Sequence, residues 1–188
     1  MLSMQLQPEF IIFLKMGFSK GFNVQLATLF GIGKIPGGGT WASLIVLLIA
    51  LYEQNAATVS FLAFFTLIIG PRAYRRLIDN SSSEDPKEYV LDEVIGMGIS
   101  LSGVYIFYRI VGGFKFNINF LSDIDTLFIL TFIIFRFFDI SKVGPVGWVE
   151  RNPKEKPYNK VIGDDIMAAL LSIIVVIIFL SVNLWLMQ

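Results

Sequence analysis

Long apolar runs separated by short polar segments dominate this chain. The last run, residues 166–187, contains no charged residue. It predicts a membrane-spanning helix, because about 20 apolar residues are needed to cross a bilayer. Apolar residues also predominate at 41–52, 56–70, 89–111 and 126–140. The pattern therefore predicts an all-α, polytopic membrane protein with about four to five membrane segments, forming one domain over residues 1–188.

The runs at 41–52 and 56–70 are each too short to cross a bilayer alone. Glu53, Gln54 and Asn55 separate them. Two arrangements are open: a helical hairpin of short or tilted segments, or one long helix that keeps its polar residues on a protected side. The hairpin is favoured, because three consecutive polar residues suit a turn better than a lipid-facing helix.

Polar and glycine-rich segments mark where the helices are expected to begin and end. Glycines crowd residues 31–39 and exclude a regular helix there, so Thr40 or Ser43 is expected to cap the helix that follows. Pro71 and the arginines after it mark a membrane exit, with polar loops at 80–87 and 112–125. A long polar stretch covers 141–160, and Asp164 and Asp165 are expected at the start of the last helix.

Composition supports the membrane class and narrows the chemistry. Hydrophobic residues make up 55% of the chain and charged residues 16%, whereas soluble domains carry about 25% charged residues. Lysine plus arginine equals aspartate plus glutamate, at 15 each, so no excess of positive charge points to nucleic acid. The chain has no cysteine and no histidine, which excludes disulfides, a cysteine nucleophile, a histidine base and sulfur- or imidazole-ligated zinc.

The distribution of charge predicts that the candidate site lies at one membrane face. Basic residues gather at 15–34, 72–87 and 142–160, so these segments are expected on the cytoplasmic side. With the hairpin, this topology brings together polar residues from four apolar segments. The residues expected at the cytoplasmic interface are Thr40, Ser43, Asp92, Glu93, Arg136, Asp139, Lys142, Asp164 and Asp165.

These residue types suggest metal-assisted phosphate chemistry on a substrate in the inner leaflet. Carboxylates offer only oxygen ligands, which suit Mg²⁺, Mn²⁺ or Ca²⁺. Arg136 and Lys142 are suited to hold phosphate oxygens, and residues 31–39 to present backbone N–H groups to an anion. Each feature alone has an ordinary explanation as a helix cap, an ion pair or a turn, so the interpretation rests on their coincidence.

The main alternative is a small cation-coupled membrane transporter or channel subunit, in which buried carboxylates form an ion path. Such a path predicts acidic groups spread through the depth of the membrane. Here the expected positions lie at one interface, which favours an enzyme.

The motifs resemble those of the phosphatidylglycerophosphatase A family, bacterial membrane lipid phosphatases, over about residues 28–172. The resemblance is carried by GIGKIP and GTWASL within 31–44, EDPKEYVLDEVIGM at 84–97, FRFFDISKVGPV at 135–146, ERN at 150–152 and GDDIMAALLS at 163–172. It implies Mg²⁺-dependent hydrolysis of phosphatidylglycerophosphate to phosphatidylglycerol and inorganic phosphate. It also implies a multi-pass protein of the bacterial inner membrane whose active site faces the cytoplasm.

By position, the resemblance assigns seven of these residues to catalysis: Asp92, Glu93, Arg136, Asp139, Lys142, Asp164 and Asp165. Asp92, Glu93, Asp139, Asp164 and Asp165 become the metal ligands, while Thr40, Ser43, Arg136 and Lys142 become the substrate-binding residues. The nucleophile is left open between an activated water and an aspartate that forms an acyl phosphate. The expected partners are a lipid phosphomonoester and the membrane.

The chain departs from the usual family pattern outside these residues. It reads GGGT at 37–40 where a further proline is usual, and PKEKPYNKVIG at 153–163 in place of a glycine-rich approach. Val143 and Ala169 replace a usual proline and glycine. The departures concern the geometry of the loops and leave every candidate carboxylate, the arginine and the lysine in place.

Overall fold

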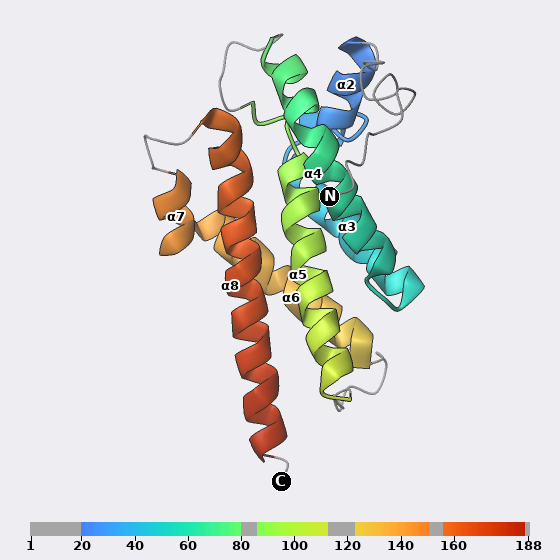
Figure 1. The fold of residues 1–188 in the computed structure, drawn as a ribbon, viewed down its shortest axis with the longest axis vertical. Helices are drawn as coiled ribbons and strands as arrows, with labels where there is room; N and C mark the ends of the chain where they lie inside the picture. The colour runs from blue at the N-terminus through green and yellow to red at the C-terminus, as the bar shows by residue number, and fades with distance from the viewer. Residues whose placement is uncertain (1–19, 80–85, 113–122, 151–155, 187–188) are drawn as a thin grey trace, which may run out of the picture.

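The computed structural model describes residues 20–79, 86–112, 123–150 and 156–186, and these ranges are helical without a strand (Figure 1). The expected all-α class is confirmed for this part of the chain. The elements are α2 (Lys20–Ala27), the 3-10 helix η1 (Ile32–Lys34), α3 (Gly38–Glu53), α4 (Ala57–Ile78), α5 (Leu91–Ile110), α6 (Asp123–Ser141), α7 (Pro145–Glu150) and α8 (Pro157–Leu186). The polar loops expected at 80–87 and 112–125 lie largely outside the described residues.

In the part of the chain that the structure describes, three helices are long and apolar enough to cross a membrane: α4, α5 and α8. Helix α3 is apolar but shorter, and α6 carries charged residues at both of its ends. Helix α5 lies at the centre, where it packs against α8 and α4 and also contacts α3 and α6 (Figure 1). The structure therefore supports three of the four to five expected membrane segments by length and composition.

The helical hairpin expected near residue 53 is confirmed as a break between α3 and α4 (Figure 1). Gln54 ends α3 in the left-handed conformation, with φ 54°. The Asn55 side-chain oxygen accepts a hydrogen bond of 2.8 Å from the backbone N–H of Ala57 and so stabilises the start of α4. The polar residues that interrupt the apolar pattern therefore form a turn.

Pro71 does not end a helix, and its expected position at a membrane exit stays a prediction. It lies inside α4, which continues to Ile78. Proline removes only one backbone donor from a helix, and the turns that follow it bury Ala73, Tyr74 and Leu77. This burial keeps the last turns of α4 helical and carries its arginines beyond the apolar run.

Helix α8 begins earlier than the sequence pattern suggested. Its first residue is Pro157, which suits the first helical position because that N–H has no partner within the helix. Asp164 and Asp165 therefore lie about two turns inside α8 instead of at its positive end. The polar stretch before α8 also contains the unexpected short helix α7, whose Val146 is fully buried.

Two glycines of α5 let neighbouring helices approach closely at the level of the site. A Cβ on Gly96 would lie 3.0 Å from the backbone oxygen of Asp165 and 2.8 Å from the ring of Phe135. A Cβ on Gly98 would lie 2.7 Å from Ala63 of α4. Small residues at such contacts allow close helix packing. Gly96 lets α8 and its aspartates approach the start of α5, and Gly98 lets α4 approach the same helix.

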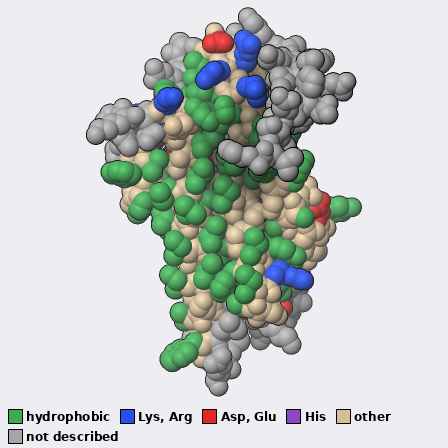
Figure 2. Space-filling model, viewed as in Figure 1, with side chains coloured by type: hydrophobic (Ala, Val, Ile, Leu, Met, Phe, Trp, Pro, Cys, Tyr) green, Lys and Arg blue, Asp and Glu red, His purple; other side chains and the backbone are tan. Residues whose placement is uncertain are grey.

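The surface agrees with a membrane-embedded body that has one charged end. Large apolar side chains are exposed along α4 and α8, among them Phe61, Phe64, Ile174 and Ile178. Figure 2 shows hydrophobic side chains along the visible face and most of the visible lysine and arginine side chains gathered at one end. Helix α4 ends and helix α8 begins at that same end (Figure 1).

Candidate active site

All five carboxylates singled out in the sequence line one cavity of about 420 Å³. The first turn of α5 contributes two of them, α8 two, and the last turns of α6 one. The lining residues are Pro86, Lys87, Tyr89, Asp92, Glu93, Asp139, Lys142, Pro157, Lys160, Val161, Asp164 and Asp165. The structure thus brings together acidic residues that lie far apart in the sequence.

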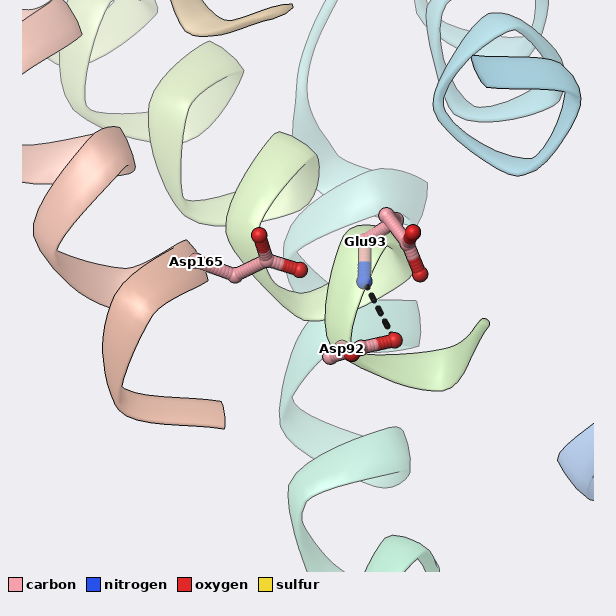
Figure 3. A group of neighbouring side chains, drawn as sticks. All are labelled: Asp92, Glu93 and Asp165. Atoms are coloured by element: carbon pink, nitrogen blue, oxygen red, sulfur yellow. Dashed lines mark hydrogen bonds between the residues drawn. The ribbon is translucent and has the colours of Figure 1, made fainter. Parts of the chain in front are cut away.

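Three of these carboxylates form a compact cluster. Oxygens of Asp92, Glu93 and Asp165 all lie within 4.8 Å of one another (Figure 3). Oε2 of Glu93 and Oδ2 of Asp165 are buried without a hydrogen-bond partner among the described residues. Buried carboxylates repel one another and need compensating positive charge, so the cluster fits a hard divalent cation.

Asp139 is paired with an arginine one turn earlier on the same helix. Its Oδ2 lies 2.5 Å from Nη1 of Arg136, and both side chains are nearly buried. Arg136 also donates through Nη2 to Oγ1 of Thr40 at 3.0 Å and through Nη1 to Oγ of Ser43 at 3.4 Å. The guanidinium therefore ties the end of α6 to the start of α3.

The expectation that Thr40 or Ser43 caps α3 is wrong. The N-cap is Gly37, which makes no side-chain capping hydrogen bond. The Ser43 hydroxyl donates to the backbone oxygen of Gly39 at 2.9 Å. Both residues lie inside the helix, where their oxygens accept hydrogen bonds from Arg136 instead of from the first-turn backbone.

Asp164 is also paired with a cation. It forms an ion pair with Lys142, the residue that follows α6. Lys142 has φ 51°, an uncommon left-handed conformation for a non-glycine residue, and its N–H donates to the Phe138 oxygen at 3.0 Å. The five carboxylates therefore divide: Asp139 and Asp164 have basic partners, and the three in the cluster face one another.

The glycine-rich stretch packs around the start of α5. A Cβ on Gly39 would lie 1.9 Å from Oε1 of Glu93, so only glycine leaves room for that carboxylate. A Cβ on Gly33 would lie 2.0 Å from the backbone oxygen of Glu88. The stretch therefore packs closely against the Glu93 carboxylate, and its expected role in binding an anion stays a prediction.

Comparison with known protein families matches residues 25–180 to the family Phosphatidylglycerophosphatase A. The chain belongs to this family. The match runs from α2 into α8 and includes every candidate site residue. No curated protein and no solved structure matches the chain. Membership supports a phosphatase activity on phosphatidylglycerophosphate, and the apolar helices support association with a membrane.

Tyr89 lines the acidic cavity and was not singled out from the sequence. It is 3% exposed, and its ring packs at 5.3 Å from that of Tyr74 and at 6.5 Å from that of Tyr158. Burial, followed by the proximity of Tyr158 and Asp92, raises the pKa of the Tyr89 hydroxyl well above its ordinary value. Its position three residues before Asp92, in the motif that carries the family resemblance, was the available signal.

Lys87 and Lys160 were also missed as lining residues of the cavity. Each was grouped with the basic segments that predicted the topology. Their sequence positions look like ordinary surface lysines, and only the fold places them beside the acidic cluster. The mouth of the cavity therefore combines positive charge with a negatively charged interior.

The departures from the usual pattern of phosphatidylglycerophosphatase A fall around the site. Gly37 is the N-cap of α3, Gly38 and Gly39 are its first residues, and residues 157–163 form the beginning of α8, whereas 151–155 lie outside the described residues. Val143 is 52% exposed, and Ala169 is fully buried in the core. None of these residues lines the acidic cavity except at the start of α8.

Proposed function

We propose that this chain hydrolyses the terminal phosphomonoester of phosphatidylglycerophosphate, yielding phosphatidylglycerol and inorganic phosphate, in a Mg²⁺-dependent reaction. The observation that carries the proposal is the cluster of Asp92, Glu93 and Asp165, set beside two carboxylates that already have basic partners. Family membership supplies the class of substrate.

Asp92, Glu93 and Asp165 are the residues that would hold Mg²⁺. Carboxylate oxygens are the ligands that this ion prefers, and two of those in the cluster, Oε2 of Glu93 and Oδ2 of Asp165, are buried without a hydrogen-bond partner among the described residues. One or two carboxylates with a substrate phosphate commonly complete the coordination of Mg²⁺. When bound, Mg²⁺ neutralises charge on the phosphate oxygens and makes phosphorus more susceptible to attack. Asp139 and Asp164 border the same cavity and complete the proposed metal-binding set.

Arg136 and Lys142 are the groups proposed to hold the substrate phosphates. A guanidinium binds phosphate through its planar fork, and an ammonium binds it as a point charge. Without substrate, Asp139 and Asp164 neutralise these cations and hold them at the site. Thr40 and Ser43 keep the guanidinium oriented through the hydrogen bonds that they accept.

The nucleophile is either a water in the cavity or one of its aspartates. Hydrolysis in isotope-labelled water, combined with hydroxylamine trapping, distinguishes them, because only an aspartyl phosphate yields a trapped protein adduct. Both routes end in phosphate release and use the same binding groups.

We place the site at the cytoplasmic face of the bacterial inner membrane. The support is the gathering of basic residues at the end where α4 ends and α8 begins, which is the bias expected of cytoplasmic segments. Nothing in the described part of the chain favours the transporter or channel alternative, because every buried carboxylate there lines the same cavity.

Mg²⁺ alone is expected to stabilise the detergent-purified protein, and Asp92→Asn should remove most of this effect. A ligand at about 100 times its Kd stabilises the folded state by about 2.7 kcal/mol, which is a rise of several degrees in the unfolding midpoint. The measurement is a thermal unfolding curve with and without Mg²⁺, with Asp79→Asn as the control, since Asp79 is an exposed residue at the end of α4. No shift in the wild type, or an equal shift in Asp92→Asn, would refute the assignment.

A further inference from the structure

A second cavity of about 480 Å³ adjoins the acidic one. Its residues come mainly from the glycine-rich stretch, with a few from the segment before α5 and from α5 and α6. They are Gly33, Lys34, Ile35, Pro36, Gly37, Gly38, Gly39, Thr40, Lys87, Glu88, Glu93 and Arg136. The metal cluster contributes only Glu93 to this second cavity.

The two cavities differ in charge. The acidic cavity has five carboxylates against three lysines, Lys87, Lys142 and Lys160. The second cavity has two carboxylates, both glutamates, against Lys34, Lys87 and Arg136. The start of α3, whose N-cap makes no side-chain hydrogen bond, adds the positive end of a helix dipole. The first cavity therefore suits cations, and the second suits an anion.

The two proposed phosphate-binding cations lie in different cavities. Lys142 lines the acidic cavity, whereas Arg136 and Thr40 line the second one. Arg136 is nearly buried, and its Nε has no hydrogen-bond partner among the described residues. A guanidinium has five N–H donors, and the ion pair with Asp139 and the hydrogen bonds to Thr40 and Ser43 do not use all of those of Arg136.

The cavities are neighbours, because Lys87 and Glu93 line both of them. A single ligand with two anionic groups on a short linker can therefore occupy both. The substrate class of the proposed function has this form: a terminal phosphomonoester joined through one glycerol to the phosphodiester that carries the lipid.

We infer that the second cavity binds the phosphodiester anion of the lipid substrate through Arg136, Thr40 and Lys34, while the phosphomonoester occupies the acidic cavity. The inference rests on the proposed function and assigns each phosphate its own site. The second cavity then determines which lipid phosphates are preferred as substrates. A lipid with a phosphomonoester but no second phosphate would occupy only the acidic cavity.

Lys34→Glu tests this inference, because Lys34 lines the second cavity alone. Replacing a positive charge by a negative one beside the bound phosphodiester, in a cavity that is partly open to solvent, should weaken substrate binding about fivefold. We expect the KM for phosphatidylglycerophosphate to rise by this factor with kcat unchanged. Phosphatidylglycerol, which has the phosphodiester and lacks the monoester, should inhibit the wild type competitively, and its inhibition constant should rise equally in the variant. Arg75→Glu is the control, since it reverses a charge on α4 outside both cavities.

Inhibition by inorganic phosphate tests whether the second cavity binds the phosphodiester of the lipid or free phosphate. Its inhibition constant should be the same in Lys34→Glu and the wild type, because free phosphate is expected in the acidic cavity. Any of three results would overturn the inference. The first is an inhibition constant that rises in Lys34→Glu for inorganic phosphate alone, and the second is no inhibition by phosphatidylglycerol. The third is an equal effect of Lys34→Glu and Arg75→Glu. Absence of phosphate release by the wild type would instead overturn the proposed function.

Discussion

Asp165→Asn is expected to lower the rate of phosphate release from phosphatidylglycerophosphate about 10³-fold. Removing one preorganised group from an active site typically lowers the rate by about this much. The substitution keeps the shape of the side chain and removes one of the three carboxylates whose oxygens lie within 4.8 Å of one another. Steady-state phosphate release at saturating Mg²⁺ measures the effect. Asp79→Asn, at an exposed position outside the cavity, should retain full activity.

The same variant should be more stable than the wild type when no divalent ion is present. Asp165 is 3% exposed, and its Oδ2 has no hydrogen-bond partner among the described residues. Removing an uncompensated charge from a buried acidic cluster relieves repulsion and desolvation. A rise in the unfolding midpoint together with lost activity shows that the carboxylate serves function. Lost activity with a lower midpoint would instead point to a folding defect.

Gly39→Ala is expected to lower kcat/KM about 100-fold, because displacing a catalytic group by about 1 Å has effects of this size. The added Cβ would lie 1.9 Å from Oε1 of Glu93, so the carboxylate must leave its present position in the cluster with Asp92 and Asp165. The clash involves the end of a flexible side chain, and alanine favours a helix over glycine. We therefore expect the unfolding midpoint to change little while activity falls.

The control for Gly39→Ala is Gly21→Ala in α2, where no heavy atom lies within 4 Å of the added Cβ. A second test is the double variant Gly39→Ala with Glu93→Asp, whose shorter side chain leaves room for the methyl group. Its activity should exceed the level expected if the two single losses were independent. Independent losses, or equal activity of Gly39→Ala and Gly21→Ala, would show that the contact with Glu93 does not matter.

Much of the helical order could be predicted from sequence because the apolar runs are long and their interruptions polar. The runs at 89–111 and 126–140 correspond closely to α5 and α6. The start of α8 could not be predicted from hydropathy, because its first two turns carry polar residues and begin at a proline. Tertiary contacts support these turns, among them the ring contact of Tyr158 with Tyr74 of α4.

Which residues form the candidate site could also be predicted in part from the sequence. The carboxylates were found because charged residues at the ends of apolar runs are unfavourable unless they serve a function. Their division into a cluster of three and two ion pairs was not predictable, since it depends on which side chains meet across α5, α6 and α8. The contact of Arg136 with Thr40 and the packing of Gly39 on Glu93 likewise arise only from the approach of α3.

The most direct test is phosphate release from phosphatidylglycerophosphate by the detergent-purified chain, measured with Mg²⁺ and after its removal by a chelator. A buried cluster of oxygen donors with partnerless atoms predicts release with Mg²⁺, loss of release after chelation and recovery when Mg²⁺ is restored. Absence of release under both conditions, or equal release with and without divalent ions, would contradict the proposed metal-dependent phosphatase.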